Sequence, residues 1–114
     1  MSMILCVTET LVNNQSISAS GNTISRGKGE HEYLIAYINV GGVAGSDTPT
    51  MTVQLQSSPD NNTWYNIESS VAITAAGQNV IRSSNFGKYV RLNYTLTGTN
   101  PVFSGVSISI NTKG

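Results

Sequence analysis

The sequence predicts an all-β protein, an antiparallel β-sandwich of jelly-roll type built from seven to nine short strands. Apolar and polar residues alternate with a period of two in several segments. Turn signals rich in Gly, Pro, Asn and Asp separate these segments every eight to twelve residues or so. No segment shows the period of an amphipathic helix. The 114 residues suit one domain, 1–114, although strand spacing alone also allows an immunoglobulin-like winding.

The first third contains two expected strands and a basic turn. Residues 4–12 are rich in β-formers and end in a predicted turn at 13–15. Residues 17–24 form a weaker strand, which Gly21-Asn22 is expected to break. Residues 26–29 (Arg-Gly-Lys-Gly) are expected to be a flexible basic turn.

The strand expected at 32–40 is apolar on both faces. Leu34, Ala36, Ile38 and Val40 alternate with Tyr33, Ile35, Tyr37 and Asn39. The pattern indicates either a central strand covered on both sides or a strand that meets a neighbouring subunit. The following residues, 41–49, have the glycines and proline of a loop and are interpreted as a contact arm. Residues 1–8 are interpreted as a second arm.

The remaining strands alternate more cleanly. Expected strands and the turns between them fall at 51–56, 59–62 (turn), 64–67, 71–73, 79–82, 89–97, 98–101 (turn) and 106–111. In the strand at 89–97, Val90, Leu92, Tyr94 and Leu96 face one way, so that side is expected to be core.

Charge excludes some partners. Six basic and six acidic residues cancel, and only 11% of the chain is charged. Binding driven by neutralising nucleic-acid phosphates is therefore not expected. No stretch reaches the length of a membrane span. Cys6 is the single cysteine, so no disulfide forms within the chain, and its thiol is expected to be buried on a strand.

The sequence holds no catalytic constellation. His31 is the single histidine, and its position between Glu30 and Glu32 suits a solvated surface residue. We expect no enzyme activity, no catalytic residue, no metal and no cofactor. Asp60-Asn61-Asn62 has the oxygens of a calcium loop, but a turn whose side chains cap its own backbone explains the same residues.

Trp64 and Tyr65 are adjacent and so point to opposite faces of a strand. One of them is expected in the core and the other outside. An exposed Tyr65 would join Tyr33, Tyr37 or Tyr89 as a contact residue, since tyrosine is enriched at interfaces. Ordinary packing explains each of these tyrosines as well. Arg91 is expected to point away from the core, into solvent or a partner.

Residues 51–111 resemble the capsid decoration, or cement, proteins of tailed phages. The resemblance rests on Ser57-Ser58-Pro59-Asp60, Trp64, Ala75-Ala76-Gly77 and the run Phe86-Gly87-Lys88-Tyr89-Val90-Arg91-Leu92. A related pattern occurs in discoidin-like carbohydrate or lipid modules, but these often carry a disulfide, for which this chain lacks the cysteines.

The resemblance implies a non-enzymatic virion protein that is made in the host cytoplasm and added to the capsid exterior. Its partner would be the major capsid protein, whose subunits it would bridge as a dimer or trimer. The residues expected at the partner interface are Tyr33, Tyr37, Val43, Asp47, Tyr65 and Arg91. The alternative is a carbohydrate- or receptor-binding module of a phage tail or cell surface.

Overall fold

The computed structural model describes residues 6–28 and 31–114 and is all β over that range, without a helix. The predicted all-β sandwich class is confirmed. The strands are β1 (Cys6–Ile17), β2 (Gly21–Asn22), β3 (Arg26–Gly27), β4 (Tyr33–Val40), β5 (Gly42–Ser58), β6 (Tyr65–Asn66), β7 (Val71–Ile73), β8 (Gly77–Ser83) and β9 (Tyr89–Lys113).

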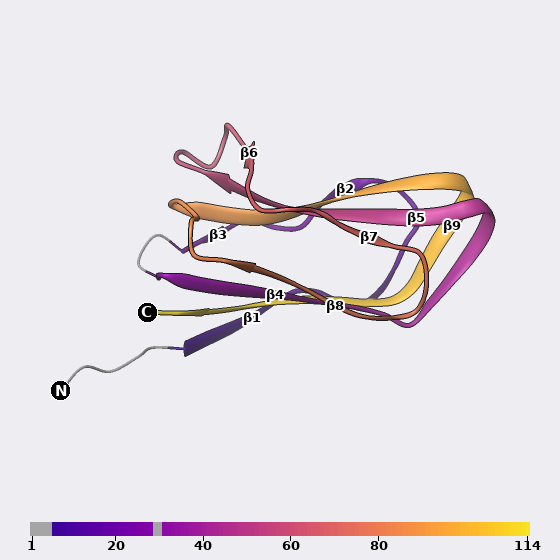
Figure 1. Ribbon diagram of the computed structural model, residues 1–114, viewed down its shortest axis with the longest axis horizontal. Helices are drawn as coiled ribbons and strands as arrows, with labels where there is room; N and C mark the ends of the chain where they lie inside the picture. The colour runs from indigo at the N-terminus through magenta and orange to yellow at the C-terminus, as the bar shows by residue number, and fades with distance from the viewer. Residues whose placement is uncertain (1–5, 29–30) are drawn as a thin grey trace.

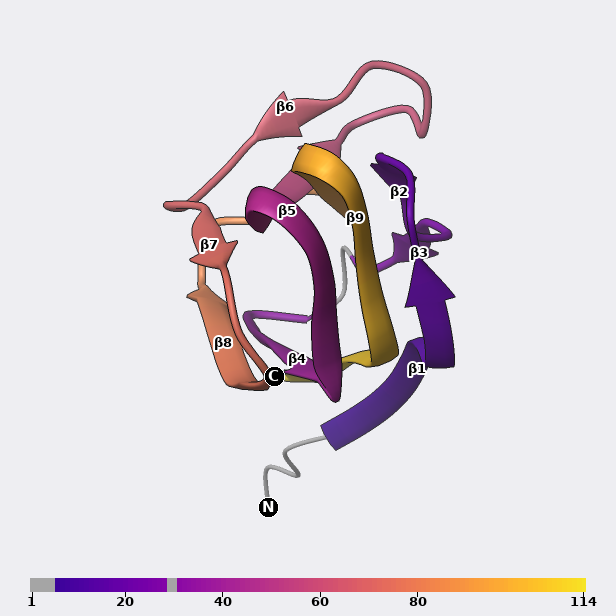
Figure 2. The ribbon, with the colours of Figure 1, turned by 90° about the vertical axis from the view of Figure 1, so that its right-hand side faces the viewer.

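Two long strands join the layers of the sandwich. All described strands belong to one antiparallel sheet with the central order β6-β5-β9-β4-β8. Figure 1 shows β5 and β9 running along the upper layer and bending together at one end into the lower layer, where β4, β8 and β1 lie. Seen from that end, β7 and β8 lie on one side of the sandwich and β1, β2 and β3 on the other (Figure 2).

The bend corrects two predicted loops. Residues 42–49 are the first part of β5, and 98–101 lie inside β9, so neither is a loop. The two segments pair with each other, Ala44 with Val102 and Ser46 with Thr99, through register shifts that curve the ladder without ending it. Gly98 permits the bend with a φ of 106°.

Other boundaries also differ from the prediction. β1 continues through the expected turn at 13–15, where Asn14 takes a φ of 47° and the register shifts. Gly21 and Asn22 do not break a strand but form β2 themselves, paired with β9. In the predicted turn at 26–29, Arg26 and Gly27 form β3, which pairs with Val90 and Tyr89. Of the predicted arm at 1–8, residues 1–5 lie outside the described residues and residues 6–8 belong to β1. Gly29, the last residue of the predicted basic turn, also lies outside the described residues.

The core lies between the layers and follows the predicted alternation. Met51, Val53 and Leu55 of β5 are fully buried, and so are Leu92 and Phe103 of β9. The β9 positions Val106, Ile108 and Ile110 cover the same core from the lower layer. Packing on both layers holds the two outer faces of the sandwich rigid relative to each other.

Candidate functional site: an exposed tyrosine face

The outer face of the lower layer gathers exposed aromatic and apolar side chains. Antiparallel pairing sets its outward residues in rows across β8, β4, β9 and β1. We call this the tyrosine face, and its rows are Tyr33–Lys113–Cys6, Arg82–Ile35–Asn111–Thr8 and Val80–Tyr37–Ser109–Thr10.

The tyrosines of β4 and the neighbouring Val80 are open to solvent. Tyr33 is 50% exposed, Tyr37 45% and Val80 38%, while Ile35 between the tyrosines is half-buried. Of the two readings for the strand at 32–40, coverage on both sides is therefore wrong for the isolated chain. Contact with a partner remains a prediction. Tyrosine combines a large apolar area with a hydrogen-bonding hydroxyl, which suits reversible burial against a protein.

The same face carries positive charge at one end. Arg82 and Lys113 are exposed, and none of the eleven residues that define the face is acidic. The Lys113 Nζ lies 5.9 Å from the centre of the Tyr33 ring, within the range of a cation–π contact. Beside Tyr33 a shallow groove of about 400 Å³ is lined by Ile35, Glu68, Arg82, Ser84, Asn85 and Lys113, among others.

The outer face of the upper layer is polar and internally bonded. Arg91 Nε donates to Gln56 Oε1 at 2.8 Å, and Gln56 Nε2 donates to Asn66 Oδ1 at 2.9 Å. The Arg91 guanidinium also lies 4.2 Å from the ring centre of Trp64, and burial lowers the pKa of Arg91. Arg91, Gln56 and Asn66 are therefore linked in one chain of hydrogen bonds across this face.

The aromatic pair differs from its prediction. Trp64 is half-buried beneath Arg91, and Tyr65 on β6 is 60% exposed, so neither residue is in the core. One of the two residues was expected in the core because neighbouring residues of a strand face opposite ways. Trp64 lies in the connection before β6, so this alternation does not apply to the pair.

The structure separates the other residues that were predicted for the interface. Tyr33 and Tyr37 share the tyrosine face, whereas Tyr65 and Arg91 belong to the upper layer. Val43 is partly buried against the core. Asp47 lies at the bend, where it accepts a hydrogen bond from the Thr99 hydroxyl. Sequence reasoning missed Val80, Arg82 and Lys113, which become neighbours of the tyrosines only through strand pairing.

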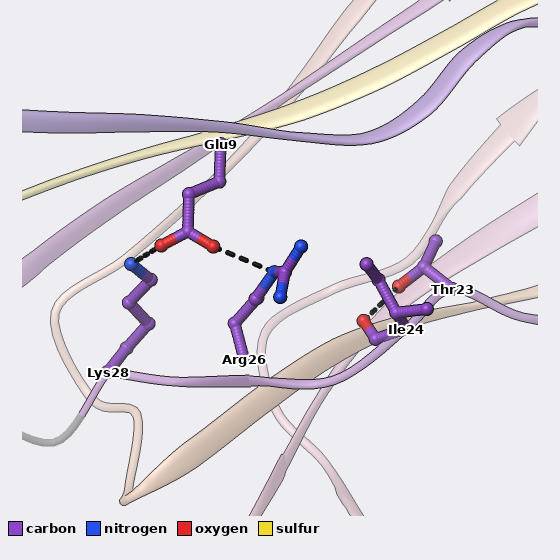
Figure 3. Close-up of polar contacts among 5 residues, drawn as sticks. All are labelled: Glu9, Thr23, Ile24, Arg26 and Lys28. Atoms are coloured by element: carbon purple, nitrogen blue, oxygen red, sulfur yellow. Dashed lines mark hydrogen bonds and ion pairs between the residues drawn. The ribbon is translucent and has the colours of Figure 1, made fainter.

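An ion cluster of Glu9, Arg26 and Lys28, of which only Lys28 is buried, lies on one side of the sandwich (Figure 3). Lys28 is 5% exposed, and its ammonium contacts the carboxylate of Glu9 on β1. Arg26 Nε lies 2.8 Å from the other Glu9 oxygen, as an ion pair without hydrogen-bond alignment. Burial lowers the pKa of Lys28. Lys28 is therefore part of an anchored segment, and the prediction of a flexible basic turn is wrong for it.

Asp60 caps its own turn. Its Oδ1 accepts hydrogen bonds from the backbone N–H of Thr63 at 2.8 Å and of Asn62 at 2.9 Å, and from the Ser58 hydroxyl at 2.9 Å. These bonds, the one from Thr63 first, lower the pKa of Asp60. The turn interpretation explains these contacts. Within residues 6–28 and 31–114, no group of three or more His, Cys, Asp or Glu side chains is placed to hold a metal ion.

Cys6 corrects a further prediction, since it is exposed at the edge of the tyrosine face rather than buried. Its thiol donates a hydrogen bond to Asn111 Oδ1 at 3.0 Å. In the part of the chain that is described, no helix is long and apolar enough to cross a membrane.

Comparison with known proteins finds one matching family model and several similar folds. A family model described as "Domain of unknown function (DUF6385)" matches residues 42–112, more than half of the chain. No curated protein matches the sequence.

Several solved structures are similar in fold, and three of them show the range. The PBSX exported protein XepA has a TM-score of 0.63 and 16% identity over 95% of this chain, which spans only 37% of XepA. The SPBc2 prophage-derived protein YomS has a TM-score of 0.56 and 7% identity, with 100% of this chain and 97% of YomS covered. A protein of the disulfide-linked pili that form Bacillus endospore appendages has a TM-score of 0.51 and 11% identity, with coverages of 96% and 84%. At such identities the likenesses show the fold alone.

Proposed function

The chain belongs to the DUF6385 family, and we propose that it is a non-enzymatic structural protein of a phage particle, a decoration protein on the capsid exterior. In this role it binds the outer surface of the head and bridges neighbouring major capsid subunits. The prophage origin of similar folds supports a phage role. The observation that carries the proposal is the tyrosine face, an exposed surface on which β4 presents two half-exposed tyrosines.

The physical requirements of a clamp agree with this face. A cement protein needs a flat contact surface on a scaffold that does not deform under load. The four strands β8, β4, β9 and β1 supply the surface, and the core on their inner side supports it. Bridging also requires more than one contact per unit, which we propose the protein achieves as a dimer or trimer. Linked contacts raise the total affinity well above that of a single one.

Binding to empty sites on a particle tests the proposal. Purified protein is mixed with heads that lack it, and the bound copies are counted after sedimentation. We expect saturation at a fixed copy number per particle. The double variant Tyr33→Ala/Tyr37→Ala is expected to abolish saturable binding, because exposed tyrosines at an interface centre commonly carry most of its energy. Tyr65→Ala removes a tyrosine of the other layer that is more exposed still, at 60%, and serves as the control. Equal loss in both variants, or no binding by the wild type, would contradict the proposal.

One observation favours a second function, recognition of a carbohydrate or receptor by a phage tail or cell surface. Tyr65 is 60% exposed beside a groove of about 460 Å³ that Ser57, Pro59, Asn85 and Lys88 help to line. An exposed aromatic ring next to hydroxyl and amide groups suits a sugar. Binding to a glycan array that Tyr65→Ala abolishes, together with no binding to heads, would favour this function over capsid decoration.

A further inference from the structure

We propose that the tyrosine face recognises an acidic segment of its protein partner, with a partner carboxylate held between Arg82 and Lys113 beside Tyr33. This inference deepens the proposed function and rests on it for the identity of the partner. It specifies the chemistry of the surface that the face contacts.

The charges of the face support an acidic partner. Arg82 of β8 pairs with Ile35 of β4, and Lys113 of β9 pairs with Tyr33 of β4. The two cations therefore lie on either side of β4, the strand that carries both tyrosines of the face. Among the described residues, ion pairs within 4.0 Å join Glu9 to Arg26 and Lys28, and neither Arg82 nor Lys113 forms one. Both side chains are exposed, so a partner can reach their charges. A basic partner surface would be repelled at this end of the face.

The groove beside Tyr33 gives the carboxylate a place to bind. Arg82 and Lys113 both line it, and Ser84 and Asn85 add neutral donors. The groove also contains one carboxylate, that of Glu68, whose Oε2 accepts a hydrogen bond from the Ser83 hydroxyl at 2.7 Å. Two cations against one carboxylate leave the groove with a net positive charge. Arginine can bind a carboxylate through two parallel hydrogen bonds, which adds geometric selectivity.

The surface next to the groove favours a protein segment over a free anion. Tyr37 on β4 and Val80 on β8 extend the exposed apolar area along these strands, away from the cations. A small anion would leave this area in water. A peptide that places an acidic residue at the groove can lay its following residues over Tyr37 and Val80 and bury them.

Titration of the isolated protein with short peptides tests the inference without any phage particle. The probes are acetyl-(Glu)4-amide and the neutral acetyl-(Gln)4-amide, followed through the backbone amide NMR signals of the whole chain at low salt. We expect the acidic peptide to shift the signals of Tyr33, Arg82 and Lys113 and to saturate at millimolar concentration, about the range of a few exposed contacts. The neutral peptide should cause no saturable shift, and about 0.5 M salt should remove the effect of the acidic one.

Charge-removing variants complete the test. Arg82→Gln and Lys113→Gln should each weaken binding of the acidic peptide by about two- to fivefold, the range of an exposed charge pair. Lys88→Gln removes an exposed cation outside the tyrosine face and should leave binding unchanged. Absence of saturation, shifts centred near Lys88, or equal effects of all three variants would overturn the inference.

The outcome separates the inference from the proposed function. If heads bind the protein but Arg82→Gln and Lys113→Gln bind them as the wild type does, the function stands and the inference is wrong. If the acidic peptide binds at the face but heads do not bind the protein, the face has the proposed selectivity and the capsid assignment is wrong.

Discussion

Replacing Glu9 by alanine is expected to destabilise the domain by about 2.5 kcal/mol, because it leaves the buried ammonium of Lys28 without its counter-ion. The backbone of Lys28 is held beside β9 by the pairing of the adjacent strand β3 and by the hydrogen bond from Lys28 N to Lys88 O at 2.8 Å. The substitution also removes the partner of Arg26. The free energy of unfolding therefore depends on a carboxylate that contributes nothing to the apolar core.

The magnitude follows from the exposure of each member of the cluster. Breaking a fully buried ion pair costs about 3–5 kcal/mol. The Lys28 side chain is 6% exposed but that of Glu9 is 24% exposed, so water enters beside the ammonium and lowers the cost to about 2 kcal/mol. The Arg26 side chain is 41% exposed, and losing its pairing adds about 0.5 kcal/mol.

A double-mutant cycle measures the pair itself. Lys28→Met keeps the apolar stem and removes the charge, at an expected cost of about 0.5 kcal/mol, because Glu9 retains Arg26. In the Glu9→Ala/Lys28→Met protein no buried charge is left unpaired, so the cost should be about 1 kcal/mol and the coupling energy about 2 kcal/mol. Urea unfolding followed by far-UV circular dichroism gives these values. A coupling energy below about 0.5 kcal/mol would refute the reasoning.

Four further predictions concern single positions. Gly98→Ala should lower the free energy of unfolding, measured in urea, by about 2 kcal/mol, since the residue has a φ of 106° and a Cβ would lie 3.0 Å from a backbone carbon. The control Gly27→Ala should lower it much less, because a Cβ there would make ordinary contacts. Thr112→Val should stabilise the protein by about 1 kcal/mol, because the fully buried hydroxyl has no hydrogen-bond partner among the described residues; a loss of stability would contradict this. The thiol of Cys6 should react with a maleimide in the native protein as fast as in the urea-unfolded protein, within about tenfold, and strong native protection would show that it is covered. An NMR titration of Asp60 should give a pKa below the usual 3.8. The carboxylate then stabilises the folded protein above pH 3.8, and this contribution is lost as the pH falls through the lowered pKa of the folded state. A pKa at or above 3.8 would be inconsistent with the capped turn.

The alternation of apolar and polar residues predicted the core well, because a strand with one buried face needs an apolar residue at every second position. Val90 and Leu92 were expected to face the core and are buried there, and Tyr94 and Leu96 on the same side are partly buried against it. Loops were predicted less well because glycine, proline and asparagine mark a bend in a strand as readily as its end. The pairing of β9 with β5 continues on both sides of Gly98. Whether a strand continues past such a glycine depends on its partner strand, which the local sequence does not show.

Strand pairing also decided what could be predicted of the candidate site. The alternation of Tyr33, Ile35 and Tyr37 indicated a second apolar face on one strand. Arg82 and Lys113 join that face from segments distant in sequence, so no local pattern identifies them. Lys28 was missed for a related reason, since its counter-ion Glu9 lies on another strand.

The pairing of β9 also has a consequence for the order of folding. β1, β2 and β3 pair with β9 alone, and Cys6 lies opposite Lys113. During synthesis the first strands therefore leave the ribosome long before their hydrogen-bonding partner exists. The sheet can be completed only after β9 has been synthesised, so we expect slow folding dominated by non-local contacts. Until then the edges of the early strands are unpaired and can pair with strands of other chains.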